Sequence, residues 1–155
     1  IKPSEDELVE IAGEASKCAK IFGVDPQVAF LSYSTHGSGK GEDVDKMCNA
    51  ARKAKEKYPD LPIDGELQFD AAVSPRVART KCPDSNVAGH ANTFIFPDIN
   101  AGNIGYKIAQ RMGNFEAYGP ILLGLNAPVN DLSRGCNASE VYSMAIITAA
   151  LANNI

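Results

Sequence analysis

Residues 28–41 read VAFLSYSTHGSGKG, and this stretch decides the fold. Its first four residues, Val28 to Leu31, form a short apolar run between turn-forming residues, which is typical of a strand buried on both faces of a sheet. The next ten, Ser32 to Gly41, are small and polar and lead directly into a helical pattern. A buried strand joined by such a loop to a helix indicates the start of a βαβ unit.

Helical patterns flank this strand on both sides. Before it, Ser4 and Glu7 have the spacing of a capping box, and apolar residues recur at helical intervals until Gly23. After it, residues 42–58 are predicted to form a helix that Pro59 ends, with acids in the first turn and lysines in the last. Further strands are predicted at 61–64, 92–96 and 119–124, and further helices at 67–80, 101–112 and 140–151.

The alternation of strands with helices predicts the fold class. Over this length it favours right-handed βαβ units and an α/β fold whose mainly parallel sheet is flanked by helices. Ligands of such sheets bind at the carboxyl ends of the strands, so the loops that follow strands are the segments to search for function.

Composition and charge exclude several classes of protein. The chain has 155 residues, of which 45% are hydrophobic and 22% charged, so it contains enough apolar residues for a core. Its formal charge is −4 and it has no long run of Lys or Arg, which argues against a dedicated nucleic-acid binder. No apolar stretch reaches the roughly 18 to 20 residues that a membrane-spanning helix needs.

The cysteines and the first residues of the chain add two expectations. Four dispersed cysteines and two histidines form no zinc-type cluster, and the cysteines are interpreted as reduced cytosolic thiols. The chain opens on Ile1 without an initiating methionine, immediately before a helix signal, and is therefore interpreted as a fragment of a longer protein.

The loop after the first strand has the composition of an anion site. Small residues let backbone N–H groups approach a ligand, hydroxyls donate, Lys40 adds charge, and the following helix adds its dipole. The glycine spacing matches neither a Walker A loop nor a dinucleotide-binding fingerprint. A flexible connector is the alternative, with His36 an ordinary surface residue.

Two segments near the strand ends carry clustered polar groups. Asp64, Glu66 and Asp70 fall within seven residues, a spacing that suits a metal site, a general base or a solvated helix start. In residues 128–136, Arg134 is suited to holding a phosphate or an oxyanion and Ser133 to hydrogen-bonding a carbonyl, with Glu140 close enough to act as a base. An ordinary helix-capping loop is the alternative for this segment.

Four blocks taken together resemble the phosphate acetyltransferase family. They are residues 32–38, 63–72, 97–107 and 128–136, which occur in the family's order and extend the resemblance over nearly the whole chain. Family members are about twice this length, so the chain resembles their C-terminal half. On that basis residues 1–138 are expected to be the second α/β domain and residues 139–155 a terminal helix that docks on the first domain.

The resemblance implies a fold like that of the isocitrate and isopropylmalate dehydrogenases and a specific reaction. Acetyl-CoA and phosphate would give acetyl phosphate and CoA, by direct thiolate attack in a ternary complex. It implies no covalent acyl-enzyme, no metal and no permanently bound cofactor, with coenzyme A as a substrate. It also implies a cytoplasmic homodimer or larger homo-oligomer without nucleic-acid or membrane partners, and a fragment that is inactive alone.

The resemblance also assigns roles to residues. Ser133 would bind the acyl carbonyl, and Arg134 would stabilise charge on the carbonyl and phosphate oxygens. The family's general base is an aspartate at the position of Glu140, a departure of one methylene. Substrate binding would involve Ser34, Thr35, Gly37, Ser38, Asn103, Tyr106, Lys107, Asn130 and Asp131.

Two related classes are the alternatives. The acetyl-CoA-binding regulatory domain of large malic enzymes departs from the blocks at 32–35 and 131–134, which this chain keeps. Phosphate butyryltransferase has a similar fold but usually lacks the block at 130–136. Both alternatives are therefore less well supported than the acetyltransferase.

Overall fold

The structure is a computed structural model that describes residues 1–153. The chain divides into two compact units, the first from Ile1 to Ile104 and the second beginning at Gly105. Helix α5 (Ile99–Met112) crosses the boundary between them.

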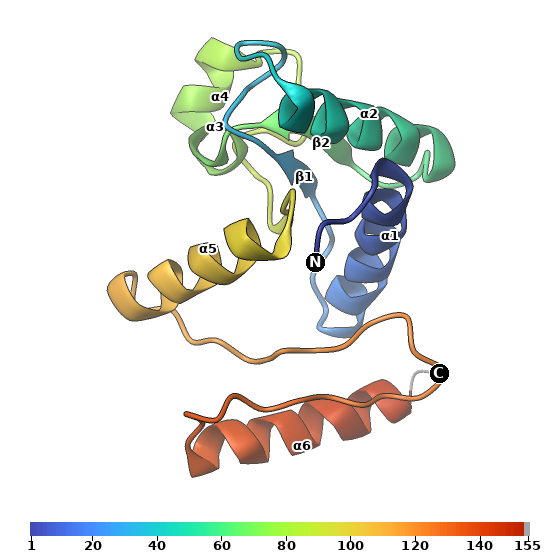
Figure 1. Cartoon of the computed structure of the whole chain (residues 1–155), viewed down its shortest axis with the longest axis vertical. Coiled ribbons are helices and arrows are strands. Elements are labelled where there is room, and N and C mark those ends of the chain that lie inside the picture. The colour runs from blue at the N-terminus through green and yellow to red at the C-terminus, as the bar shows by residue number, and fades with distance from the viewer. Residues whose placement is uncertain (154–155) are drawn as a thin grey trace. The chain divides into compact units, whose positions relative to one another are not determined.

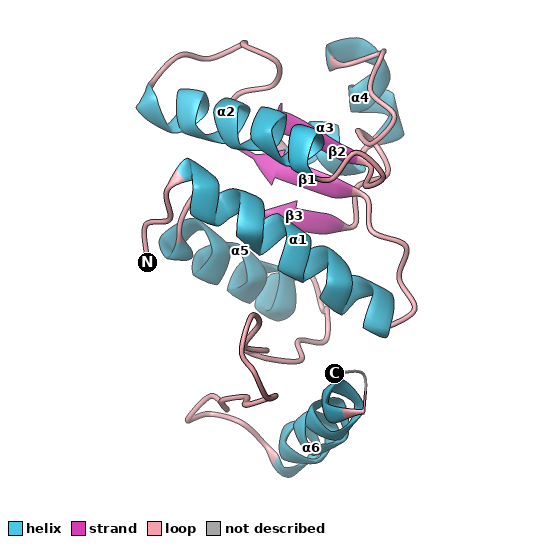
Figure 2. Ribbon diagram, turned by 90° about the vertical axis from the view of Figure 1, so that its right-hand side faces the viewer, coloured by secondary structure: helices cyan, strands magenta, loops and turns pink. Residues whose placement is uncertain are grey.

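The first unit is built on a parallel sheet of three strands in the order β2-β1-β3; Figure 1 labels β1 and β2, and Figure 2 labels all three. The central strand β1 (Val28–Leu31) pairs in parallel with β2 (Ile63–Leu67) on one side and β3 (Thr93–Ile95) on the other. All four residues of β1 are buried, as the apolar run predicts. The parallel pairing confirms the predicted α/β class.

Helices cover both faces of this sheet (Figure 2). Helices α1 (Glu5–Ile21) and α2 (Glu42–Lys57) pack on the face to which Val28 and Phe30 point. The short helices α3 (Phe69–Val73) and α4 (Pro75–Lys81) lie against the other face, which buries Ala29 and Leu31. Successive residues of β1 thus supply two separate cores, because side chains alternate along a strand. The predicted capping box of Ser4 and Glu7 is confirmed, with both of its hydrogen bonds present.

Two predicted elements of the first unit differ from the structure. The second strand was expected at 61–64 but spans Ile63–Leu67, because its buried carboxylates interrupt the apolar pattern that marks a strand. The helix expected at 67–80 is two helices, α3 and α4. Pro75 is the first residue of α4, and its ring and missing N–H prevent a helix from continuing through it.

The second unit contains the end of α5, an irregular segment and α6 (Ala138–Ala152). The strand expected at 119–124 is not part of the sheet. Within residues 1–153, its pairing is limited to one antiparallel bridge between Ile121 and Asn130. Leu122 and Leu123 are exposed, and an apolar run alone does not distinguish a buried strand from such a segment.

Helix α6 matches the start of the expected terminal helix at 139–155, of which residues 154 and 155 lie outside the described part. The predicted boundary between 138 and 139 stays a prediction. None of the helices among the described residues is long and apolar enough to span a membrane.

Gly65 provides a test of the packing at the β1–β2 pair. We expect Gly65→Ala to lower the free energy of unfolding by at least about 2 kcal/mol, because a Cβ there would lie 2.6 Å from Phe30 Cβ at a backbone φ of +154°. Gly23→Ala is the matched control, since Gly23 also has a positive φ but nothing within 4 Å of an added Cβ. Urea unfolding of both variants measures the difference, and equal losses would contradict the packing at Gly65.

Candidate functional site

Two predicted binding residues of the loop after β1 are buried. Ser34 is 0% exposed and Thr35 is 4% exposed. Ser34 Oγ donates to Glu66 Oε1 at 2.8 Å, and Thr35 Oγ1 accepts from the backbone N–H of Gln68 at 3.0 Å. Both hydroxyls are therefore occupied by contacts within the chain.

A carboxylate of the protein occupies the centre of the predicted anion loop. Glu66 is 2% exposed, and its Oε1 accepts from the Gly37 backbone N–H at 2.7 Å as well as from Ser34. Burial by itself raises the pKa of Glu66. The donors around the carboxylate, led by the Gly37 amide and the Ser34 hydroxyl, more than offset this and hold the pKa below its ordinary value. Glu66 is thus a buried anion surrounded by loop donors.

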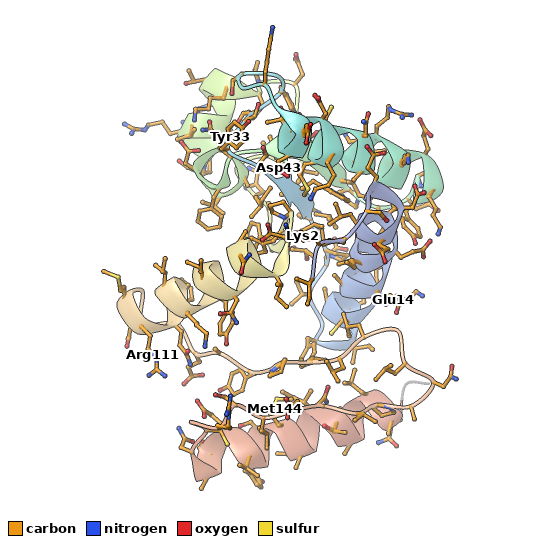
Figure 3. The ribbon with its side chains drawn as sticks, viewed as in Figure 1. Lys2, Glu14, Tyr33, Asp43, Arg111 and Met144 are labelled. Carbon is orange, nitrogen blue, oxygen red and sulfur yellow. The ribbon has the colours of Figure 1, made fainter. Side chains whose placement is uncertain are left out.

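The outer part of the same loop faces solvent. Gly37, Ser38 and Lys40 are exposed, and the Ser38 hydroxyl accepts from the Thr35 backbone N–H at 3.0 Å. Tyr33 OH donates to the Lys40 carbonyl at 2.8 Å, which joins the two ends of the loop near the start of α2 (Figure 3). Of the four residues predicted in this loop, Gly37 and Ser38 are thus the ones accessible to a ligand.

Asp64 forms a second buried centre on β2. Its Oδ1 lies 2.8 Å from Lys55 Nζ, while Oδ2 accepts from Ser85 Oγ at 2.5 Å and lies 3.3 Å from His36 Nε2. These four residues belong to the lining of a polar cavity of about 410 Å³. As expected from the sequence, His36 is an exposed surface residue, and its imidazole also contacts the buried Asp64 of β2.

The same contacts make Asp64 a source of pH-dependent stability. Burial by itself raises the pKa of Asp64, but Lys55, Ser85 and the Gly65 backbone N–H hold it below its ordinary value. A carboxyl whose folded pKa is lowered stabilises the fold above its unfolded pKa of about 3.9, and this stabilisation is lost as pH falls through the folded value.

We therefore expect Asp64→Asn to cost about 2 kcal/mol of unfolding free energy near pH 6 and progressively less below about pH 4. Denaturant unfolding at several pH values measures this difference. Asp60→Asn, at an exposed aspartate, is the control. A cost that does not shrink on acidification would contradict the charged role of Asp64.

The predicted binding residues of α5 lie on its exposed surface. Asn103 belongs to the first unit, and Tyr106 and Lys107 belong to the second. The Lys107 ammonium stands 5.1 Å from the centroid of the Tyr106 ring, within the range of a cation–π contact.

The second unit presents Ser133 and Arg134 on a tight turn. The Cys136 backbone N–H donates to the Ser133 carbonyl at 3.0 Å, and the Gly135 N–H donates to Ser133 Oγ at 3.3 Å. Both Ser133 and Arg134 are exposed, so the turn directs two polar side chains to solvent.

Glu140 follows that turn in the first turn of α6 and closes a capping box. Its Oε2 accepts from the Asn137 backbone N–H at 2.9 Å, while Asn137 Oδ1 accepts from the Glu140 N–H at 2.9 Å. The contacts of Glu140 in the structure are therefore those expected from the helix-capping alternative. No hydrogen bond to Glu140 Oε1 occurs within residues 1–153.

Asn130 and Asp131 lie beside a cavity of about 680 Å³ in the second unit. Asn130 is held at both ends of its amide: Oδ1 accepts from the Leu122 N–H at 3.0 Å, and Nδ2 donates to Thr148 Oγ1 at 2.8 Å. Met144 points from α6 toward the preceding segment and also lines the cavity (Figure 3). The remaining lining is mostly apolar: Pro128, Leu132, Val141, Ala145, Ala149 and Ala152, together with Thr148.

The structure thus groups the predicted residues into two sets, one in each unit. Sequence reasoning missed Glu66 and Gln68 as partners of the loop, although both lie in the acidic block that it singled out. Burial was the missing information, since the acidic block was interpreted as a metal site, a base or a solvated helix start. No group of three or more His, Cys, Asp or Glu in the described part of the chain is arranged to hold a metal ion.

Comparison with known proteins gives consistent matches. The sequence model of the family described as "Phosphate acetyl/butaryl transferase" matches residues 1–149. The phosphate acetyltransferase of Bacillus subtilis is 60% identical over 152 residues, which are 98% of this chain and 47% of that protein. The phosphate acetyltransferase of Staphylococcus epidermidis is 55% identical over 150 residues, 94% of this chain and 46% of that protein.

A solved structure agrees with the sequence matches. The crystal structure of a phosphotransacetylase from Streptococcus pyogenes superposes with a TM-score of 0.96 at 59% identity, covering 100% of this chain and 47% of that one. The chain spans about half the length of the curated relatives it matches. With a parallel α/β unit, four sequence blocks in order and a family match over 149 residues, the chain belongs to the phosphate acetyl/butaryl transferase family.

Proposed function

We propose that this chain is the C-terminal half of a phosphate acetyltransferase, which transfers an acetyl group reversibly between coenzyme A and inorganic phosphate. The observation that carries the proposal is the exposed Ser133–Arg134 turn immediately before the capped start of α6, in a chain 60% identical to the Bacillus subtilis phosphate acetyltransferase. In this proposal the full-length enzyme consists of this chain and an N-terminal half of about equal length.

In the proposed reaction, the CoA sulfur attacks the carbonyl carbon of acetyl phosphate. A C–S bond forms, the bond from that carbon to the phosphate oxygen breaks, and inorganic phosphate leaves. The Ser133 hydroxyl donates a hydrogen bond to the carbonyl oxygen. The Arg134 guanidinium stabilises negative charge on that oxygen and on the phosphate. Its planar fork of N–H donors can contact two oxygens at once.

Glu140 takes the thiol proton in this proposal. The capping box holds Oε2 against Asn137, which fixes the carboxylate and leaves Oε1 for the thiol. The exposed loop residues Gly37 and Ser38, the α5 residues and the Asn130–Asp131 pair supply substrate contacts. Ser34 and Thr35 contribute by shaping the loop, because their hydroxyls bind Glu66 and Gln68.

The proposal includes how the protein is assembled and where it works. Exposed apolar side chains of α6, namely Val141, Tyr142 and Ile146, support docking of that helix on the N-terminal half. Coenzyme A, phosphate and acetyl phosphate are the proposed substrates, with no permanently bound cofactor. A homodimer or larger homo-oligomer in the cytoplasm is the proposed state.

Assay of acetyl-CoA formation from acetyl phosphate and CoA tests the proposal. We expect activity from the full-length enzyme and none from the 155-residue chain, because a two-domain cleft lacks one wall without the other half. Acetyl phosphate is expected to be a better substrate than butyryl phosphate. A preference for butyryl phosphate would favour the butyryltransferase alternative, and acetyl-CoA binding without turnover would favour the regulatory domain of a malic enzyme.

A further inference from the structure

We propose that Glu66 is the positioning residue of the loop that binds substrate in this enzyme. Its carboxylate acts as an internal anion that fixes the loop from Ser34 to Gly39 and so holds Ser38 in place. The inference rests on the proposed function, because it concerns the substrate contacts of the same loop.

The hydrogen bonds that Glu66 Oε1 accepts come from one loop, and the Cys48 thiol of α2 also interacts with the carboxylate. Oε1 accepts from Ser34 Oγ at 2.8 Å and from the Gly37 N–H at 2.7 Å. Ser34 Oγ in turn accepts from the Gly39 N–H at 2.9 Å, and the His36 N–H donates to the Glu66 backbone carbonyl at 3.1 Å. The Glu66 side chain therefore fixes Ser34 and Gly37 directly and Gly39 through Ser34.

The carboxylate has the properties that this role requires. Glu66 is buried, and within residues 1–153 no lysine or arginine forms an ion pair with it. A buried charge without a counter-ion is retained only where hydrogen bonds replace its hydration, and here the loop supplies those bonds. The dependence is mutual, since a disordered loop would leave the charge unsatisfied. The ordered loop is therefore coupled to the ionised state of Glu66.

This arrangement fixes the positions of the exposed residues Gly37 and Ser38. Ser38 lies between Gly37 and Gly39, which Glu66 holds directly and through Ser34, so its position follows theirs. Its Oγ also accepts from the Thr35 N–H at 3.0 Å, and its N–H donates to the Thr35 carbonyl at 3.1 Å. Glu66 itself does not reach solvent. It acts on substrate through Gly37 and Ser38, which makes it a positioning residue and not a catalytic one.

Kinetics of Glu66→Gln and Ser38→Ala in the full-length enzyme test the inference. Ser38→Ala identifies the substrate that the loop contacts as the one whose KM rises. We expect Glu66→Gln to raise that same KM about tenfold while kcat stays within threefold, because neutral hydrogen bonds hold the loop less firmly than charge-assisted ones. In the double variant the two effects are expected to be non-additive, since both act through the position of Ser38.

Hydrogen exchange gives a readout that does not depend on activity. Amides of residues 34–39 are expected to exchange at least about tenfold faster in Glu66→Gln, with no comparable change elsewhere. Ser34→Ala, which keeps the carboxylate but removes one donor and the acceptor for Gly39, is expected to show the same local change. Glu56→Gln, at a carboxylate that is 65% exposed, is the matched control and is expected to change neither measurement.

Each failure has a distinct meaning. Unchanged exchange at 34–39 in Glu66→Gln, or fully additive KM effects, would overturn the positioning role. Ser38→Ala without effect on any KM would remove the loop from the site and overturn the inference, while the transferase activity stands. An inactive full-length enzyme would refute the proposed function, and the exchange experiment would still decide whether Glu66 orders the loop.

Discussion

Arg134→Lys in the full-length enzyme is expected to lower kcat by about 10² to 10³ although the positive charge remains. The guanidinium offers a planar fork that contacts two oxygens at once, whereas an ammonium is a point donor at the end of a flexible stem. Arg134 lies at the second position of the turn that begins at Ser133, so its backbone is fixed while its side chain is exposed for substrate. Loss of two-point contact is therefore the main physical change.

Steady-state kinetics with acetyl phosphate and CoA measure this effect. Arg111→Lys is the matched control, because Arg111 is an exposed arginine near the end of α5 that has no assigned role (Figure 3). A kcat for Arg134→Lys within threefold of the parent would remove Arg134 from the catalytic role.

Most of the first unit could be predicted from local patterns. The run from Val28 to Leu31 identified the central strand because it is apolar on both faces. The capping box of Ser4 and Glu7 identified the first helix because it spans only four residues of sequence. These features depend on near neighbours in the chain. The strand at 63–67 does not. Its Asp64 is tolerated only through partners 9 to 28 residues away along the chain, and its Glu66 only through partners 29 and 32 residues away.

The same limit applies to the loop. Its composition predicted an anion, and an anion is present, but it is the side chain of Glu66 from the neighbouring parallel strand. Ser and Thr hydroxyls and Gly backbone N–H groups bind an external phosphate or an internal carboxylate equally. Composition alone therefore does not distinguish a ligand site from a site for a side chain of the same protein. The pairing of β1 with β2 supplies the information, because it places the end of β2 beneath the loop.

Glu140→Gln in the full-length enzyme is expected to slow attack on acetyl phosphate by about 10² to 10⁴ at pH 7. A thiol with an ordinary pKa near 8.5 is mostly protonated at that pH, so removal of its proton limits the reaction. At pH 9 more thiolate forms without a base, and the deficit of Glu140→Gln is expected to shrink. Glu140→Asp is expected to keep most of the activity, because a carboxylate remains and the sequence resemblance implies an aspartate at this position in the family.

The capping box makes a specific control necessary. Glu140 accepts from the Asn137 N–H, so a loss of activity in Glu140→Gln has two physical explanations: loss of a base, or a loosened start of α6. Asn137→Ala removes the other half of the box, the bond from the Glu140 N–H to Asn137 Oδ1, and leaves the carboxylate in place. Loss of such a cap costs about 1 kcal/mol of helix stability. If Glu140 acts as the base, Asn137→Ala keeps activity within a few-fold of the parent and its pH–rate profile is parallel. If the two variants lose activity equally, with parallel profiles from pH 7 to 9, Glu140 serves the helix start alone, and the thiol proton must leave by another route.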